Sequence, residues 1–89
     1  MQVIHHPEEQ RFTLAVEGHT AVLEYTRHGD TLIFTHTGVP PAIGGRGIGS
    51  QLARAGLEYA RQQNCRVRAL CWFVSGYIER HPEYQDLRA

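Results

Sequence analysis

The segment Gly44–Ser50 combines four glycines with the start of a predicted helix. Backbone N–H groups at a helix N-terminus have no partners inside the helix, and the helix dipole adds partial positive charge there. Glycines also let an anion approach the backbone closely. The segment therefore predicts an anion site, and a phosphate or pyrophosphate is the group that such a site binds best.

Two common phosphate-binding motifs do not fit this segment. A P-loop requires lysine and then serine or threonine after its last glycine, whereas Ser50-Gln51 stands here. A dinucleotide fingerprint requires a third glycine where this chain has Ser50, and an acidic residue about 20 positions later, near Leu70, where none lies. A glycine-rich turn that serves only the geometry of the chain remains an alternative at this point.

The cysteines and histidines show no pattern of a metal site. Cys65 and Cys71 lack CxxC spacing, which argues against a zinc site and against a disulfide framework. No two of the six histidines stand at i, i+4 on a predicted helix. No apolar run approaches the length of a membrane span, and the N-terminus does not read as a signal segment. We expect a cytoplasmic protein that contacts no membrane and holds no metal.

The charge distribution favours a compact anionic ligand over a nucleic acid. The net charge is zero, whereas a nucleic-acid binder needs a broad basic face. All nine basic residues are arginines, and the stretch 46–68 has Glu58 as its only acid. This local excess suits a small polyanion, although Arg54 and Arg61 are equally explained as the solvated face of a helix.

Periodicity predicts an α+β fold in which residues 1–89 form one domain. Residues 11–39 alternate apolar and polar side chains in three short strands, which predicts an antiparallel meander, and residues 1–6 are a candidate for one more strand. A helix is expected over residues 48–63, a strand over 67–70 and a second helix from 73 or 74 to Pro82. The order is β-β-β-α-β-α, with one βαβ unit whose two strands run parallel.

Four separated segments of the chain resemble the GNAT N-acetyltransferases, most closely their minimal single-domain members. They are His36-Thr37-Gly38-Val39-Pro40, Gly45-Arg46-Gly47-Ile48-Gly49, Cys71-Trp72-Phe73-Val74 and His81-Pro82-Glu83-Tyr84. The family motif has glutamine or arginine, two residues, glycine, one residue, and glycine or alanine, and Gly47 and Gly49 fill its small positions. Gly44 stands where the family has glutamine or arginine, so we expect weaker CoA binding, with Arg46 as the nearest cation.

The resemblance implies that the chain binds acetyl-CoA and transfers its acetyl group to an amine. The pyrophosphate is expected on the backbone of the glycine segment, at Gly44, Gly45, Arg46, Gly47, Ile48, Gly49 and Ser50. The pantetheine arm is expected to pair with the strand over residues 35–39, with contacts at Thr37 and Val39.

The same resemblance places Cys71 beside the thioester. There its thiol is a candidate proton donor to the leaving thiolate, or a carrier of the acetyl group, and packing as a small apolar residue is the alternative. Tyr77 lies near the tyrosine acid of larger family members but is better explained as a core residue. His36 and Glu24 are weak candidates for the base and are better explained as sheet-surface residues. Cys65 is expected to be structural.

The acceptor is the least specified part of the prediction. The chain has no helices between its early strands, where larger family members wall the acceptor site, so an open acceptor side and an amine on a protein are expected. A non-catalytic module that binds CoA or acetyl-CoA is the main alternative, and a structural protein whose glycine turn binds nothing is a further one. The oligomeric state is not specified by the sequence.

Overall fold

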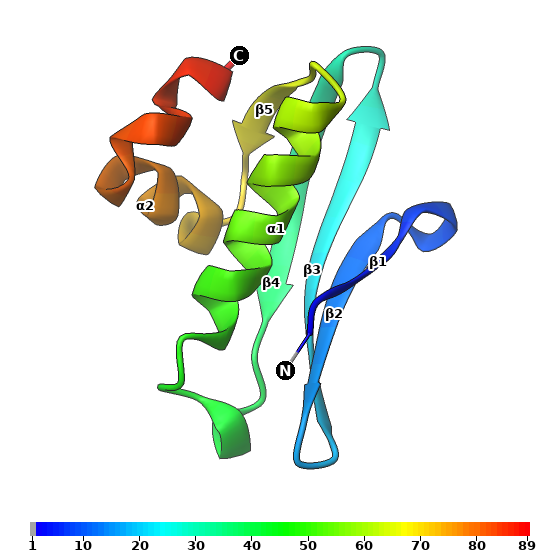
Figure 1. Ribbon diagram of the computed structural model, residues 1–89, viewed down its shortest axis with the longest axis vertical. Helices are drawn as coiled ribbons and strands as arrows, with labels where there is room; N and C mark the ends of the chain where they lie inside the picture. Colours follow the sequence, from blue (N-terminus) through cyan, green and yellow to red (C-terminus); the bar gives the residue numbers. More distant parts are fainter. Residues whose placement is uncertain (1) are drawn as a thin grey trace.

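The computed structural model describes residues 2–89 and shows one five-stranded sheet with two α-helices (Figure 1). The strands lie in the order β1-β2-β3-β4-β5, and the elements follow one another as β-β-β-β-α-β-α. Within these residues no helix is long and apolar enough to cross a membrane. The bounds are Ile4–His6 (β1), Arg11–Val16 (β2), His19–His28 (β3), Thr31–Gly38 (β4), Ile48–Gln62 (α1), Arg66–Ala69 (β5) and Trp72–Arg80 (α2).

Strands β1 to β4 form an antiparallel meander. Apolar residues alternate along β2, so Phe12, Leu14 and Val16 are buried while the residues between them are not. Glu17 and Gly18 turn the chain from β2 into β3 with positive φ angles of 51° and 79°, as a tight hairpin turn requires. The predicted meander is confirmed, and β1 adds the strand for which residues 1–6 were a candidate.

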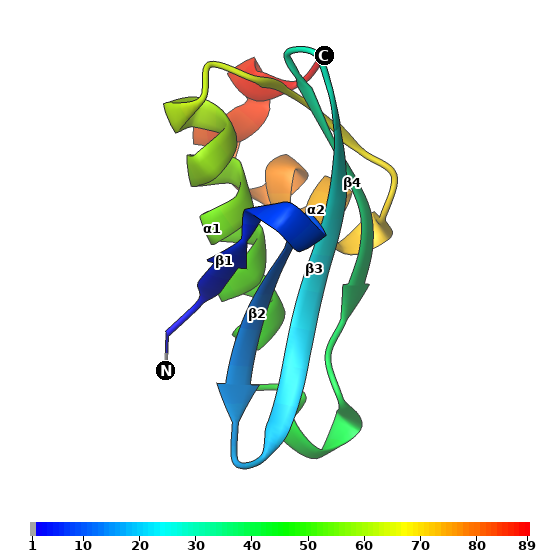
Figure 2. The same cartoon turned by 90° about the vertical axis from the view of Figure 1, so that its right-hand side faces the viewer.

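The second half of the chain forms the predicted βαβ unit. Strand β5 pairs with β4 in parallel, from Thr31 opposite Arg66 to Phe34 opposite Ala69. Helix α1 crosses one face of the sheet between these strands, and α2 lies beside it (Figures 1 and 2). The helix bounds agree with the sequence prediction to within one or two residues. A 3-10 helix over Pro82–Leu87, which the sequence analysis did not predict, closes the fold.

Helix α1 sits close to the sheet because a glycine faces it. A Cβ atom added at Gly56 would lie 2.8 Å from the ring of Phe34 and 2.9 Å from a methyl group of Leu23. Both side chains are fully buried, so any larger residue at position 56 must push helix and sheet apart. The rest of the helix face that meets the sheet is apolar and buried, with Ile48, Leu52, Ala53, Leu57 and Ala60.

Two features of β4 shape the region next to α1. The backbone N–H groups of Leu70 and Cys71 both donate to the carbonyl of Phe34, at 2.9 and 3.2 Å, and after that point β5 leaves β4. In addition, Tyr25 lies opposite Phe34 while Glu24 lies opposite His36, so Thr35 is an extra residue in a β-bulge. The last half of β4 therefore has a partner on its β3 side but not on its β5 side.

Candidate functional site

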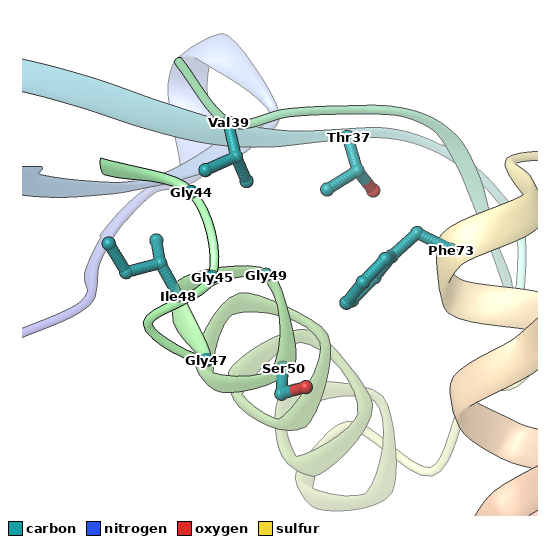
Figure 3. A pocket seen from close by; sticks show the side chains of 9 residues that line it. All are labelled: Thr37, Val39, Gly44, Gly45, Gly47, Ile48, Gly49, Ser50 and Phe73. Carbon is teal, nitrogen blue, oxygen red and sulfur yellow. The ribbon is translucent and has the colours of Figure 1, made fainter. Parts of the chain in front are cut away.

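A cleft of about 420 Å³ lies where β4 parts from β5, at the N-terminus of α1 (Figure 3). The end of β4 forms one side and the start of α1 another, while α2 contributes one aromatic ring. The lining residues are Thr37, Val39, Gly44, Gly45, Gly47, Ile48, Gly49, Ser50 and Phe73. The structure thus brings together eight of the nine residues that were expected to bind CoA; the ninth, Arg46, does not line the cleft.

The glycine loop presents free backbone donors to this cleft. Gly45 and Gly47 have backbone φ angles of 77° and 72°, which residues with a side chain rarely adopt. Gly47 caps α1 without any side-chain hydrogen bond, and the N–H of Gln51 is the first to bond back, to the Gly47 carbonyl at 3.1 Å. The N–H groups of Ile48 to Ser50 consequently have no partner within the helix. They form a donor set with the chemistry that a phosphate group needs.

The space in front of the loop is also open enough for a phosphate. A Cβ atom placed on Gly45 or on Gly47 would meet no other atom within 4 Å, so both glycines face open space. Gly49 differs, because a Cβ atom there would lie 2.7 Å from the ring of Phe73. Phe73, which is 37% exposed, closes the cleft on the α2 side. From the sequence, Phe73 was expected to start a helix and was part of one family-like segment, but it was not expected to line the cleft.

The bulge explains why Thr37 and Val39 face the cleft. Before it, Leu32 and Phe34 point into the core; after it, the exposed Thr35 and His36 follow one another and the alternation resumes one residue later. Thr37 and Val39 consequently turn toward α1, as Figure 3 shows. Without the extra residue, His36 would occupy the inward position.

Cys71 joins the cleft through Thr37. It is the N-cap residue of α2, is partly buried, and has its Sγ 3.3 Å from the hydroxyl oxygen of Thr37. Its own N–H, like that of Leu70, donates to the Phe34 carbonyl at the point where β4 and β5 separate. The thiol therefore lies at the junction of β4, β5 and α2, although Cys71 is not itself among the lining residues.

Arg46 is engaged outside the cleft. Its guanidinium donates to both carboxylate oxygens of Glu17 in the β2–β3 hairpin, at 2.8 and 3.3 Å. This hydrogen bonding, with the charge of Arg46, lowers the pKa of Glu17. The pair is largely exposed, so its contribution to stability is small. In this arrangement Arg46 ties the loop to the hairpin.

The remaining candidates are not among the residues that line the cleft. Tyr77 is 5% exposed and stacks on His81 with ring centroids 3.8 Å apart, and burial raises its pKa. Cys65 is buried in the core. Glu24 and His36 lie directly opposite one another on the face of the sheet turned away from α1. No group of three or more potential metal ligands occurs among residues 2–89.

Comparisons with known proteins agree with this geometry. Residues 11–87 match the family described as GCN5-related N-acetyl-transferase. Protein NATD1 of Gallus gallus is 33% identical over 98% of this chain and 82% of its own length, and Protein NATD1 of Homo sapiens is 32% identical over 98% and 80%. The NMR solution structure of a GCN5-like protein from Staphylococcus aureus superposes with a TM-score of 0.78 at 28% identity, covering 99% of this chain and 87% of that one. The chain belongs to the GCN5-related N-acetyltransferase family.

Proposed function

We propose that this chain binds acetyl-CoA in the cleft and transfers the acetyl group to an amine. The observation that carries the proposal is the junction of an unpaired strand edge and a free helix N-terminus in one cleft. Thr37 comes from the end of β4 and Val39 from the residue just after it, while the glycine loop and the start of α1 form the other side. A long ligand with amide groups at one end and a pyrophosphate at the other matches this pair of features.

In this proposal, the two sides of the cleft bind different parts of acetyl-CoA. The N–H groups of Ile48, Gly49 and Ser50 are placed to donate to a pyrophosphate. The edge of β4 beyond Phe34 carries backbone groups without a β5 partner, which can pair with the amides of the pantetheine arm as an added strand does. Phe73 offers an apolar ring against which the arm can pack.

Cys71 is the residue that we place in the chemistry. Acetyl-CoA supplies an acyl thioester, the group that an amine attacks. The thiol of Cys71 lies at the separation of β4 and β5 and can give its proton to the departing thiolate, with the hydroxyl of Thr37 holding the sulfur in place. As a thiolate, Cys71 could instead carry the acetyl group between donor and acceptor. An amine on a protein is the acceptor class that we favour.

The test is to supply acetyl-CoA with a set of amines and measure the release of free CoA, together with calorimetry of CoA binding. Binding heat and amine-dependent release are the expected results. Binding without transfer to any protein or small amine would identify a non-catalytic CoA-binding module. Absence of both binding heat and thermal stabilisation at millimolar CoA would show that the cleft does not bind this ligand.

A further inference from the structure

A smaller cavity, of about 240 Å³ and called the β1 cavity here, lies between β1 and the C-terminal half of α1. Helix α1 packs mainly on β2 and β3, and β1 is the edge strand of the sheet on the side away from β5 (Figure 1). Ala55 lines the space between helix and edge strand with only a methyl group, so the space is not filled. Pockets for drug-sized ligands usually measure about 300–1,000 Å³. The β1 cavity therefore suits a smaller molecule.

Four residues of α1 line the β1 cavity because they share one face of the helix. They stand at i, i+3, i+4 and i+7, as Ala55, Glu58, Tyr59 and Gln62. The Oε2 atom of Glu58 accepts a hydrogen bond from the hydroxyl of Tyr84 at 2.6 Å, which holds the carboxylate in place. Glu58 forms no salt bridge among residues 2–89, since Arg61 pairs with Asp86 instead, and Arg54 does not line the cavity. Its negative charge is therefore available to a ligand.

Three aromatic rings line the same cavity. The ring of His5 in β1 stacks on that of Phe12 in β2 with centroids 4.2 Å apart, and the ring of Tyr59 crosses that of His5 at 63° with centroids 4.3 Å apart. The rings consequently form a corner and not a flat wall. Burial, and secondly the charge of His6, lower the pKa of His5 below its ordinary value of 6.5. The imidazole is therefore largely uncharged at pH 7 and does not repel a cation.

This set of groups matches the chemistry of a quaternary ammonium ion. Aromatic rings attract cations through their quadrupole, and aromatic walls are the usual way in which proteins bind quaternary ammonium groups. Such a group has no N–H to donate, so it needs few hydrogen-bond acceptors around it, and the carboxylate of Glu58 supplies the opposite charge. An anion would be repelled by Glu58, and a neutral apolar ligand would cover this carboxylate without compensating its charge.

We propose that the β1 cavity binds a small quaternary ammonium compound, with the cationic group in the corner of His5 and Tyr59 and beside Glu58. The β1 cavity and the cleft share no lining residue, so this site is separate from the one that we assign to acetyl-CoA. The proposal consequently stands or fails independently of acetyl transfer.

The decisive comparison uses choline and 3,3-dimethylbutan-1-ol in NMR titrations at pH 7. The two molecules have the same shape, but only choline is charged. Choline should shift the backbone amides of His5 and Tyr59 saturably in the millimolar range, and leave those of Gly45–Ser50 unchanged. The neutral alcohol should bind about 10-fold more weakly, because it gains neither the cation–π attraction nor the attraction to a carboxylate. Equal affinity for the two compounds, or no saturable shift with choline, would overturn the proposal.

Glu58→Gln removes the charge but keeps an oxygen that can accept from the hydroxyl of Tyr84. This variant should bind choline about 10-fold more weakly and should bind the neutral alcohol as the native chain does. Glu24→Gln is the matched control, because Glu24 is also partly exposed but lies on the face of the sheet turned away from α1, and it should keep the native affinity. Native choline affinity in Glu58→Gln contradicts the role of the carboxylate and overturns the proposal.

Ala55→Leu provides a test that leaves the charges unchanged. A leucine side chain at this partly exposed helix position should fill the β1 cavity and abolish choline binding, while thermal unfolding of the variant shows that the fold is kept. Tyr59→Leu should weaken choline binding about 2- to 5-fold through loss of one aromatic ring. If a folded Ala55→Leu variant binds choline with native affinity, choline binds elsewhere and the proposal is wrong.

Discussion

The contact between Thr37 and Cys71 joins two residues that stand 34 positions apart in the sequence. It places a thiol with a hydroxyl neighbour at the separation of β4 and β5, which suits proton donation to a leaving thiolate. Cys65 offers a contrast within the same chain, since it is fully buried and has only a long contact, 3.8 Å, to the carbonyl of Gln63. The two cysteines should therefore behave differently when they are replaced.

Cys71→Ser should keep the fold and CoA affinity but reduce the rate of acetyl transfer about 10²-fold, because a hydroxyl is a much weaker acid than a thiol. The rate is measured as CoA release with Nα-acetyl-lysinamide. Cys65→Ala is the control and should leave the rate of the folded protein unchanged. If Cys71 carries the acetyl group, acetyl-CoA without acceptor should also add the mass of one acetyl group to the peptide containing Cys71. If Cys71→Ser transfers the acetyl group as fast as the native chain, Cys71 is only a packing residue.

Gly47→Val should abolish CoA binding in calorimetry, because its side chain would project into the space in front of the helix N-terminus. Gly29→Val is the matched control. Gly29 lies in the β3–β4 turn at a φ of 59°, also with no atom within 4 Å of a Cβ position, so it carries the same backbone strain without touching the cleft. Equal CoA affinity in both variants would show that the glycine loop does not hold the ligand.

At the scale of elements, the close contact of α1 with the sheet fixes where the helix N-terminus points. Gly56→Ala should destabilise the protein by about 1–3 kcal/mol, because the added methyl group overlaps the buried Phe34 and Leu23. Denaturant unfolding measures this change. Gly76→Ala in α2 meets only the flexible end of Arg80, at 3.3 Å, and should be neutral or stabilising by up to about 1 kcal/mol through helix propensity. A neutral Gly56→Ala would contradict the tight packing described here.

Strand β1 carries a pH-sensitive contact at His5. Its ring stacks on Phe12 at 4.2 Å and its Nε2 lies 2.6 Å from the hydroxyl of Tyr25. Burial, and secondly the charge of His6, lower the pKa of His5 below its ordinary value of 6.5. The unfolded chain therefore binds this proton more readily, so the stability contributed by neutral His5 is complete above about pH 6.5 and is lost as pH falls below it.

His5→Gln should accordingly flatten the decline of unfolding free energy between pH 7 and pH 5. Urea unfolding at a series of pH values measures this dependence of the unfolding free energy on pH. His28→Gln, at an exposed position, should retain the native slope. The same slope in His5→Gln as in the native chain would mean that other groups cause the decline.

The sequence predicted the elements because their signals are local. Alternation marks β2, and the recurrence of Ile48, Leu52 and Ala55 marks α1. The bulge at Thr35 has no such signal, since it depends on the pairing of β4 with β3 and on the loss of β5 as a partner. Thr37 and Val39 were named from the family resemblance, and the bulge is what turns them toward the cleft. The ion pair between Arg46 and Glu17 could not be predicted from the sequence either, because the two residues are 29 positions apart.

At the scale of the whole molecule, the two faces of one small sheet differ in what they present. The inner side joins the glycine loop, the end of β4 and Phe73 into the cleft, and the outer side presents His36 and Glu24 where β5 departs. The β1 cavity, at about 240 Å³ smaller than the cleft, lies between β1 and the C-terminal half of α1, lined by Val3, His5, Phe12, Ala55, Glu58, Tyr59 and Gln62. It is separate from the cleft and has no role in the proposed reaction.

An NMR titration with CoA tests whether the cleft between β4 and α1 binds this ligand, because backbone amide resonances report binding residue by residue without turnover. We predict saturable shifts at the amides of Gly45–Ser50 and Thr37–Val39, while the amides of Val3, His5 and Tyr59 around the β1 cavity stay unchanged. A spectrum that does not respond to millimolar CoA, or shifts confined to the β1 cavity, would contradict CoA binding in the cleft.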